Sequence, residues 1–261
     1  MTLDLAFDES GDGPALIVVH GLYGSATNWR SLAKRFAERF RVIAVDLRNH
    51  GRSPWSDEMN YPAMADDLIR LMDKLGLERA HLLGHSMGGK AVMTLALNAP
   101  GRVDRLLVLD IAPVAYQHDL SDFIEAMLAI DITNAKGRSD IDGQLAESVP
   151  ERAIRGFLLQ NLRRDDEGGY CWRINLQALH DQMAHITGFP ELHASFTGPS
   201  LFLHGDRSDY VRPEYEPGIQ SLFPKASITT VVNAGHWLHA EQADAVHDRV
   251  IEFLTAQNPH E

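Results

Sequence analysis

Hydrophobic residues in this chain form short continuous runs, and segments with helical periodicity separate these runs. A continuous apolar run is typical of a strand that is covered on both faces. Such runs predict strands at 15–19, 41–45, 80–83, 103–109, 199–205 and 227–232, with a possible opening strand at 3–8. Apolar residues three and four apart predict helices at 28–40, 61–75, 87–98 and 214–223, and a final helix follows residue 238. Strands that alternate with helices predict right-handed crossovers and a mainly parallel sheet flanked by helices, which is an α/β fold.

This alternation stops between residues 114 and 188. The segment has helical patterns at 119–131, 144–147, 151–163 and up to about 186, and no strong buried strand. We interpret it as a helical cap inserted after the sixth strand, 103–109, with residues 1–113 and 189–261 forming the core. Insertions at strand ends build substrate pockets. Tyr116, Trp172 and Leu176 are therefore candidates for lining a pocket, although an aromatic residue of the cap can equally belong to the cap's own core. Trp237, in the core, is a further candidate.

The segment 82–89 reads Leu-Leu-Gly-His-Ser-Met-Gly-Gly, between a predicted strand and a predicted helix. Its frame Gly84-x-Ser86-x-Gly88 matches the nucleophile elbow of the α/β-hydrolases. Residues without side chains at 84 and 88 allow the strand and the helix to approach each other around a strained turn. Ser86 is therefore the candidate nucleophile.

Two further strand ends carry candidate chemistry. His236 follows the last predicted strand and Gly235, so it should lie at the same sheet edge as Ser86, and we predict that it is the general base. The loop 20–24 closes the strand 15–19; in an α/β-hydrolase this loop supplies an oxyanion amide, which by position is that of Leu22, and Met87 supplies the other. Polar residues of the neighbouring turns, among them His20, Asp46 and His50, are expected to be structural.

The elbow, the His-Gly loop, the turn 46–53 and Gly235-His236 together resemble the α/β-hydrolase superfamily over nearly the whole chain. More closely, the segments 109–114 and 233–241 look like a bacterial carboxylesterase subgroup that is related to a mitochondrial hydrolase of animals. The resemblance implies a serine carboxylesterase that needs no cofactor and prefers small or medium acyl esters.

The expected position of the catalytic acid is unusual here. In most of the superfamily the acid lies three residues after the glycine that ends the seventh strand, and this position is Ser208 when counted from Gly205. A serine cannot carry the negative charge that orients and stabilises the histidine. Asp110 ends the neighbouring sixth strand, and the subgroup is similar in having an Asp there, so Asp110 is the predicted acid. Asp206 and Asp209 remain alternatives.

Composition narrows the remaining possibilities. The 261 residues, 44% of them hydrophobic, can form one globular unit, and a net charge of −12 disfavours nucleic acid and anionic membranes as partners. No apolar run approaches ~18 residues and the first residues lack signal-peptide features, so we expect a cytoplasmic protein without membrane insertion. Cys171 is the only cysteine, and no histidine spacing indicates a metal.

The expected partner is thus a small-molecule ester, and the expected assembly is a monomer or small homo-oligomer. Two alternatives stay open. The same triad could serve a thioesterase or a lactonase, and a hydrolase fold can also act as a ligand receptor without turnover.

Overall fold

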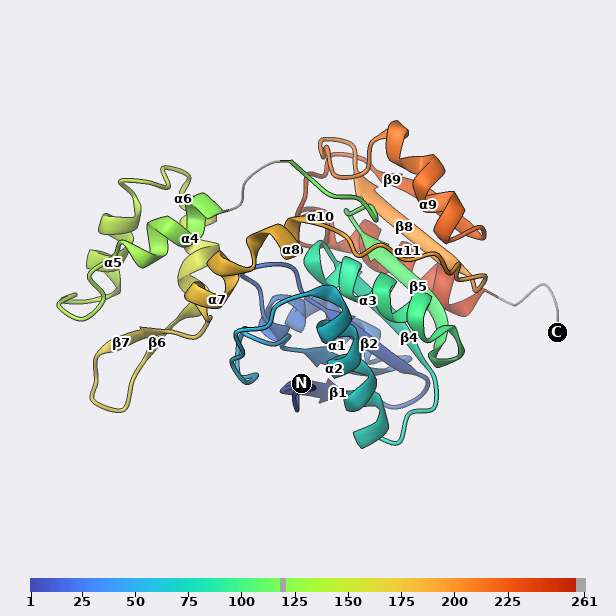
Figure 1. Ribbon diagram of the computed structural model, residues 1–261, viewed down its shortest axis with the longest axis horizontal. Coiled ribbons are helices and arrows are strands. Elements are labelled where there is room, and N and C mark those ends of the chain that lie inside the picture. Colours follow the sequence, from blue (N-terminus) through green and yellow to red (C-terminus); the bar gives the residue numbers. More distant parts are fainter. Residues whose placement is uncertain (118–120, 257–261) are drawn as a thin grey trace.

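Seven strands form one twisted sheet in the computed structural model, which describes residues 1–117 and 121–256. Every neighbouring pair is parallel except β1 and β3, so the mainly parallel α/β architecture expected from the sequence is confirmed (Figure 1). The strands lie in the order β1 (Phe7–Ser10), β3 (Arg41–Val45), β2 (Ala15–Val19), β4 (Ala80–His85), β5 (Val103–Leu109), β8 (Ser200–Gly205) and β9 (Ala226–Val231).

Helices cover both faces of this sheet, which explains the continuous apolar runs of its central strands. Alternate residues of β2 belong to opposite cores: Ile17 packs with one set of helices and Leu16 with the other. The first set is α2 (Tyr61–Lys74), α3 (Met87–Asn98) and α9 (Glu216–Leu222), and the second is α1 (Arg30–Phe36), α10 (Leu238–Glu241) and α11 (Ala243–Thr255). Single 3-10 turns precede or connect these elements: η1 (Ala26–Trp29), η2 (Pro100–Arg102) and η4 (Pro213–Tyr215).

Some boundaries differ from the sequence prediction. β1 begins at Phe7 rather than at residue 3, because this edge strand is largely exposed and has no apolar run to mark it. The helix expected at 28–40 ends at Phe36. The strand that we counted as the sixth is β5, the fifth strand of the described chain.

The segment after β5 is folded as helices that lie to the left of the sheet in Figure 1. It also contains a two-stranded antiparallel hairpin, β6 paired with β7, which the sequence did not predict. The predicted helix at 119–131 begins outside the described residues. The elements of this segment are α4 (Ser121–Leu128), α5 (Arg138–Leu145), α6 (Arg152–Leu158), η3 (Leu159–Asn161), β6 (Leu162–Arg164), β7 (Tyr170–Trp172), α7 (Leu176–Asp181) and α8 (Met183–Thr187).

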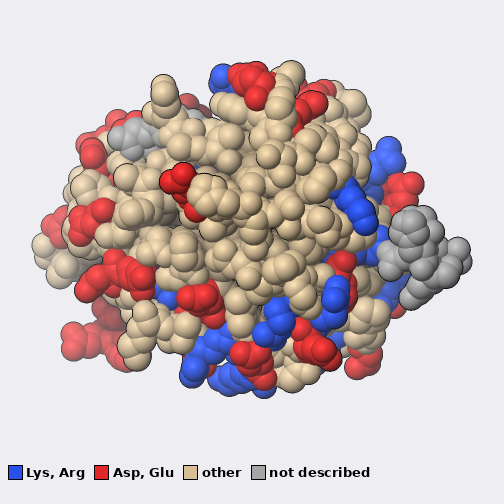
Figure 2. All heavy atoms as spheres, turned by 45° about the vertical axis from the view of Figure 1, so that its right-hand side comes forward, with Lys and Arg blue, Asp and Glu red and all other residues tan. Residues whose placement is uncertain are grey.

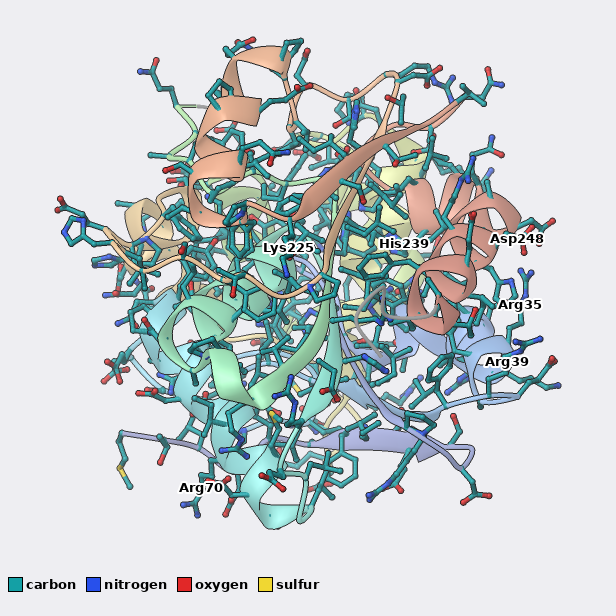
Figure 3. All side chains as sticks on the ribbon, turned by 90° about the vertical axis from the view of Figure 1, so that its right-hand side faces the viewer. Arg35, Arg39, Arg70, Lys225, His239 and Asp248 are labelled. Atoms are coloured by element: carbon teal, nitrogen blue, oxygen red, sulfur yellow. The ribbon has the colours of Figure 1, made fainter. Side chains whose placement is uncertain are left out.

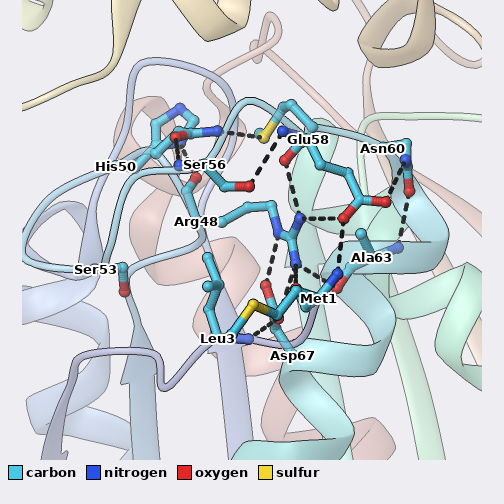
Figure 4. Close-up of polar contacts among 12 residues, drawn as sticks. Met1, Leu3, Arg48, His50, Ser53, Ser56, Glu58, Asn60, Ala63 and Asp67 are labelled. Carbon is cyan, nitrogen blue, oxygen red and sulfur yellow. Dashed lines mark hydrogen bonds and ion pairs between the residues drawn. The ribbon is translucent and has the colours of Figure 1, made fainter.

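A buried ion pair fixes the loop that follows β3 (Figure 4). The guanidinium of Arg48 is fully buried and binds both oxygens of Asp67 in α2, at 2.7 and 2.9 Å. It also donates to the carbonyl oxygen of Glu58 at 2.9 Å. A bidentate arginine–carboxylate pair has both strength and a defined geometry. This pair therefore holds the loop 46–53 against α2, in line with the structural role expected for the polar groups of that loop.

Figure 2 shows one face of the molecule, on which charges of both signs occur. In Figure 2, Lys and Arg side chains alternate with Asp and Glu along the lower edge of the visible face and do not form a patch of one sign. Among the described residues, no helix has both the length and the apolar character required to cross a bilayer.

Candidate active site

Ser86 lies on a tight turn between β4 and α3. Its φ of 53° is in the left-handed region, which a residue with a side chain seldom adopts. A Cβ at Gly84 would come within 2.3 Å of the carbonyl oxygen of Gly88, and a Cβ at Gly88 would come within 2.4 Å of the carbonyl oxygen of His20. Both glycines are therefore required for the strand, the helix and the neighbouring loop to pack around the serine.

Three side chains from three strand ends form a hydrogen-bonded chain. The Oγ of Ser86, after β4, lies 3.0 Å from Nε2 of His236, which follows β9. The Nδ1 of the same imidazole lies 2.7 Å from Oδ2 of Asp110, which follows β5. Parallel strands bring their carboxyl ends to one sheet edge, and this places the three residues together although they are far apart in sequence.

Asp110 is held by several hydrogen bonds at the end of β5. It is fully buried and has a φ of 53°. Its backbone amide donates to the carbonyl of Leu203 at 2.7 Å, and its Oδ1 accepts from the amide of Gly205 at 3.0 Å. The hydroxyl of Ser208 donates to Oδ2. These contacts fix the orientation of the carboxylate toward His236.

The two alternative acids lie elsewhere. Asp206 accepts a hydrogen bond from the amide of Ala234 at 3.1 Å, and backbone amides hold the pKa of its carboxyl below the ordinary value. The side chain of Asp209 is 89% exposed and lies 3.8 Å from Arg212. Of the three candidates, Asp110 alone is hydrogen-bonded to His236.

The loop after β2 brings backbone against the serine. A Cβ at Gly21 would lie 3.1 Å from Cβ of Ser86, so this loop approaches the serine closely. Met87 is the first residue of α3, where amides have no partner within the helix and the helix dipole favours negative charge. Leu22 and Met87, whose amides the sequence predicts to hold the oxyanion, both border a cavity that reaches Ser86.

Both ring nitrogens of His20, at the start of this loop, are hydrogen-bonded to the backbone. Its Nδ1 donates to the carbonyl of Gly21 at 2.8 Å, and its Nε2 accepts from the amide of Leu47 at 3.0 Å. Burial lowers the pKa of His20, which keeps the ring neutral. This arrangement agrees with the structural role expected from the sequence.

Sequence reasoning missed two histidines that support the base. His85 donates from Nε2 to the carbonyl oxygen of His236 at 2.8 Å, and its ring packs on that of His239 with centroids 4.4 Å apart. Burial holds the pKa of His85 well below its ordinary value and lowers that of His239 to about 3, so both rings are neutral. His239 lies on the interior side of the C-terminal helices, whereas Asp248 lies on their outer side (Figure 3). Only the elbow motif, in which His85 precedes Ser86, could have indicated the first of them.

A cavity of about 220 Å³ opens at Ser86 and His236. Its walls are mainly apolar and come from the ends of the sheet strands and from α4 and α6, in the segment after β5. Trp237 lines it, and the centroid of its indole lies 5.9 Å from that of the Phe157 ring. Tyr210 closes one side, where its ring stacks on His236 at 4.0 Å. The cap residues that line the cavity are Phe123, Ile154, Phe157 and Leu158.

The other predicted pocket residues are distributed differently. Tyr116 lines a second, smaller cavity of about 20 Å³ that also reaches Ser86. Trp172 lines neither cavity, which corrects the sequence-based expectation. It pairs with Leu162 in the β6–β7 hairpin and faces a separate groove beside Trp55. Leu176 is buried in the apolar core at the start of α7 and also lines neither cavity.

No cluster suited to a metal ion occurs in the part of the chain that the structure describes. Within residues 1–117 and 121–256, no three His, Cys, Asp or Glu side chains are grouped so that they could hold one. The side chains hydrogen-bonded to one another at Ser86 are the imidazole of His236 and the carboxylate of Asp110.

The fold, together with the hydrogen-bonded Ser86, His236 and Asp110, indicates a class of protein. Comparison with known proteins supports the same class. A family described as alpha/beta hydrolase fold matches residues 14–243, and the chain belongs to that family. The solved structure titled "Marine microorganism esterase" superposes with a TM-score of 0.94, at 38% identity over 97% of this chain and 100% of that one.

Two curated relatives make the class more specific. The sn-1-specific diacylglycerol lipase ABHD11 of Mus musculus is 45% identical over 92% of this chain and 81% of its own length. Esterase YbfF of Escherichia coli (strain K12) is 39% identical over 92% of both chains. With relatives and a structural neighbour of this kind, the chain is an ester hydrolase.

Proposed function

We propose that the protein is a serine carboxylesterase in which Ser86 is the nucleophile, His236 the general base and Asp110 the acid that orients it. The observation that carries the proposal is the continuous hydrogen-bonded chain from Ser86 Oγ to His236 at 3.0 Å and on to Asp110 at 2.7 Å. Its geometry is that of a triad, which is recognised by distances and roles and not by sequence position.

The reaction has two balanced steps. In the first, Ser86 Oγ attacks the ester carbonyl carbon while His236 Nε2 takes the hydroxyl proton, and the same nitrogen then gives that proton to the leaving alkoxide, which departs as the alcohol. In the second, a water loses a proton to His236 and attacks the acyl carbon, and the proton returns to Ser86 as the carboxylic acid leaves. The protein ends each cycle unchanged.

Charge develops on the carbonyl oxygen in both steps. The amides of Leu22 and Met87 are proposed to hold this oxyanion, with support from the approach of Gly21 to Ser86 and from the position of Met87 at the start of α3. Fixed amides stabilise such charge without reorganisation, and the loss of one donor in other enzymes costs about 100- to 1,000-fold in rate.

Esters of small to medium acyl groups are the proposed substrates. The apolar walls of the 220 Å³ cavity support an ester over a charged substrate. The name of one relative, a diacylglycerol lipase, brings glyceride esters into the set to be tested. Thioesters and lactones could react at the same triad and belong in the same assay. The lone Cys171 supports a reducing compartment, and we propose a cytoplasmic monomer or small homo-oligomer.

Covalent labelling tests this proposal. A fluorophosphonate probe should label the intact protein, and Ser86→Ala should abolish labelling while the melting temperature stays close to that of the wild type. An unlabelled wild-type protein would favour the alternative, a hydrolase fold that binds a ligand without turnover. A series of p-nitrophenyl esters of rising acyl length then gives the acyl preference.

A further inference from the structure

Two cavities of very different size meet at Ser86. The large one, about 220 Å³, includes the ring of His236 and that of Trp237 in its wall. The small one, about 20 Å³, is bounded by Met87, Tyr116 and Ile186 and does not include His236. An ester bound to Ser86 has two arms, its acyl chain and its alcohol, and each arm has to enter one of these spaces.

The position of the base decides which arm enters which cavity. His236 Nε2 has to give a proton to the leaving oxygen, so that oxygen and the alcohol attached to it must lie on the His236 side of the reacting carbon. In the proposed mechanism the carbonyl oxygen faces the amides of Leu22 and Met87, two residues that also border the small cavity. With the alcohol in the large cavity, the small cavity is the second space at Ser86 that can receive the acyl chain.

The small cavity has little capacity. One water-sized group needs about 10–15 Å³ in the same measure of volume. A cavity of about 20 Å³ therefore accommodates a methyl or ethyl group but not a longer chain. The large cavity has about ten times that space, enough for an extended apolar alcohol.

Hydrogen bonds keep the walls of the small cavity in place. The hydroxyl of Tyr116 accepts from the amide of Ala112 at 2.8 Å and donates to the carbonyl of Tyr210 at 2.6 Å. The Nζ of Lys90 donates to the carbonyls of Thr187 and Gly188, at 2.8 and 2.5 Å, and holds the end of α8 against α3. Enlarging the cavity for a longer acyl chain would break such bonds in a buried setting, where unpaired polar groups are costly.

From this geometry we propose that the enzyme selects esters with a short acyl group, acetyl or propionyl, and a larger apolar alcohol. This selection rests on the proposed function, because it requires Ser86 as nucleophile and His236 as the acid toward the leaving group. Ile186 and Tyr116 set the acyl limit, and Phe157 and Trp237 form the wall along the alcohol.

A pair of isomeric esters tests the proposal on the wild-type protein. Hexyl acetate and ethyl hexanoate have the same atoms and nearly the same hydrophobicity but exchange the long arm between alcohol and acyl group. We expect kcat/KM for hexyl acetate to exceed that for ethyl hexanoate by at least about tenfold, since one misplaced methylene already changes specificity by about 10- to 200-fold. Equal values, or a preference for ethyl hexanoate, would overturn the assignment of the two arms.

A matched pair of variants tests whether Ile186 limits the length of the acyl chain. Ile186→Ala removes side-chain volume from the small cavity and should lower the ratio of the two kcat/KM values at least about threefold, toward ethyl hexanoate. Ile141→Ala makes the same change at a buried cap residue in α5 that lines neither cavity, and it should leave the ratio unchanged. An equal shift in both variants, or none in Ile186→Ala, would contradict the proposed acyl limit.

The same assays separate this proposal from the proposed function. If Ser86→Ala abolishes hydrolysis but the wild type treats the two isomers alike, the esterase proposal stands and the assignment of the arms fails. If the wild type hydrolyses neither ester and does not react with the fluorophosphonate probe, both proposals fail together.

Discussion

The hydroxyl of Ser208 donates a hydrogen bond to Oδ2 of Asp110, the same oxygen that faces His236 Nδ1 at 2.7 Å. Ser208 stands at the position that corresponds to the catalytic acid in most of the superfamily. Here its hydroxyl contacts the carboxylate of Asp110, which comes from the neighbouring strand β5. Positions 110 and 208 thus both lie beside the imidazole of His236. A serine at position 208 is therefore compatible with a carboxyl group next to His236, because Asp110 supplies that group.

Removing the charge of Asp110 tests its proposed role. Asp110→Asn keeps the size of the side chain but can no longer stabilise the imidazolium, and kcat should fall by about 10,000-fold, the scale found when a triad acid becomes an amide. Steady-state kinetics and thermal melting measure the two effects. Asp209→Asn is the matched control, because its side chain is 89% exposed, and it should change kcat little. A large loss in the control with near-native Asp110→Asn would reassign the acid.

His85 is expected to act on catalysis through His236. Because its Nε2 holds the carbonyl of His236, His85→Phe should lower kcat by about tenfold, the scale of one lost hydrogen bond, with little change in KM. His85→Gln keeps an N–H donor of similar reach and should recover part of the loss. If the glutamine variant is no better than the phenylalanine variant, the hydrogen bond does not position the base.

The cavity walls predict different effects for two aromatic residues of the cap. Phe157→Ala should reduce kcat/KM for hexyl acetate by about tenfold and change that for methyl acetate much less, because lost contact area affects only substrates that reach it. Trp172→Ala should leave this ranking unchanged, since Trp172 lines a separate groove. The ratio of the two esters is the measurement. A shift of the ratio by Trp172→Ala alone would place the substrate against the hairpin.

Lys90 should make stability depend on pH. Burial lowers its pKa from 10.5 to about 7, although Nζ donates to two carbonyls. Between pH 7 and 9 the unfolded chain then binds more protons at this site than the folded chain, so the free energy of unfolding rises with pH, by up to about 1.4 kcal/mol per pH unit. Urea unfolding of the wild type and of Lys90→Met across this range measures the slope. Parallel curves for the two proteins would show that Lys90 does not titrate there.

The fold was predictable where burial leaves a pattern in the sequence. The strands β2 and β3 match their predicted limits because both faces are covered and every residue except Arg41 is apolar. The β6–β7 hairpin was missed since its three-residue strands include exposed or half-buried residues, among them Arg163 and Arg164, and so show no apolar run. An exposed edge strand, β1, was displaced for the same reason.

The site was predictable where a backbone constraint appears in the sequence. Gly84 and Gly88 mark the turn that carries Ser86, because only glycine fits there. The position of Trp172 was not predictable, since an aromatic residue in a cap packs equally well in a cavity wall or on a hairpin. The contact of His85 with His236 depends on how β4 and the loop after β9 meet, and no local pattern records that approach.

If Ser86 is the nucleophile, acyl transfer passes through an ester on its hydroxyl oxygen. The most direct measurement mixes the protein rapidly with p-nitrophenyl acetate, quenches in acid and determines the mass of each peptide. We expect one acetyl group on the peptide that contains Ser86, together with a burst of nitrophenolate no larger than the enzyme concentration, and neither in Ser86→Ala. An acetyl group on another residue, or a burst that persists in Ser86→Ala, would contradict the role of Ser86 as nucleophile.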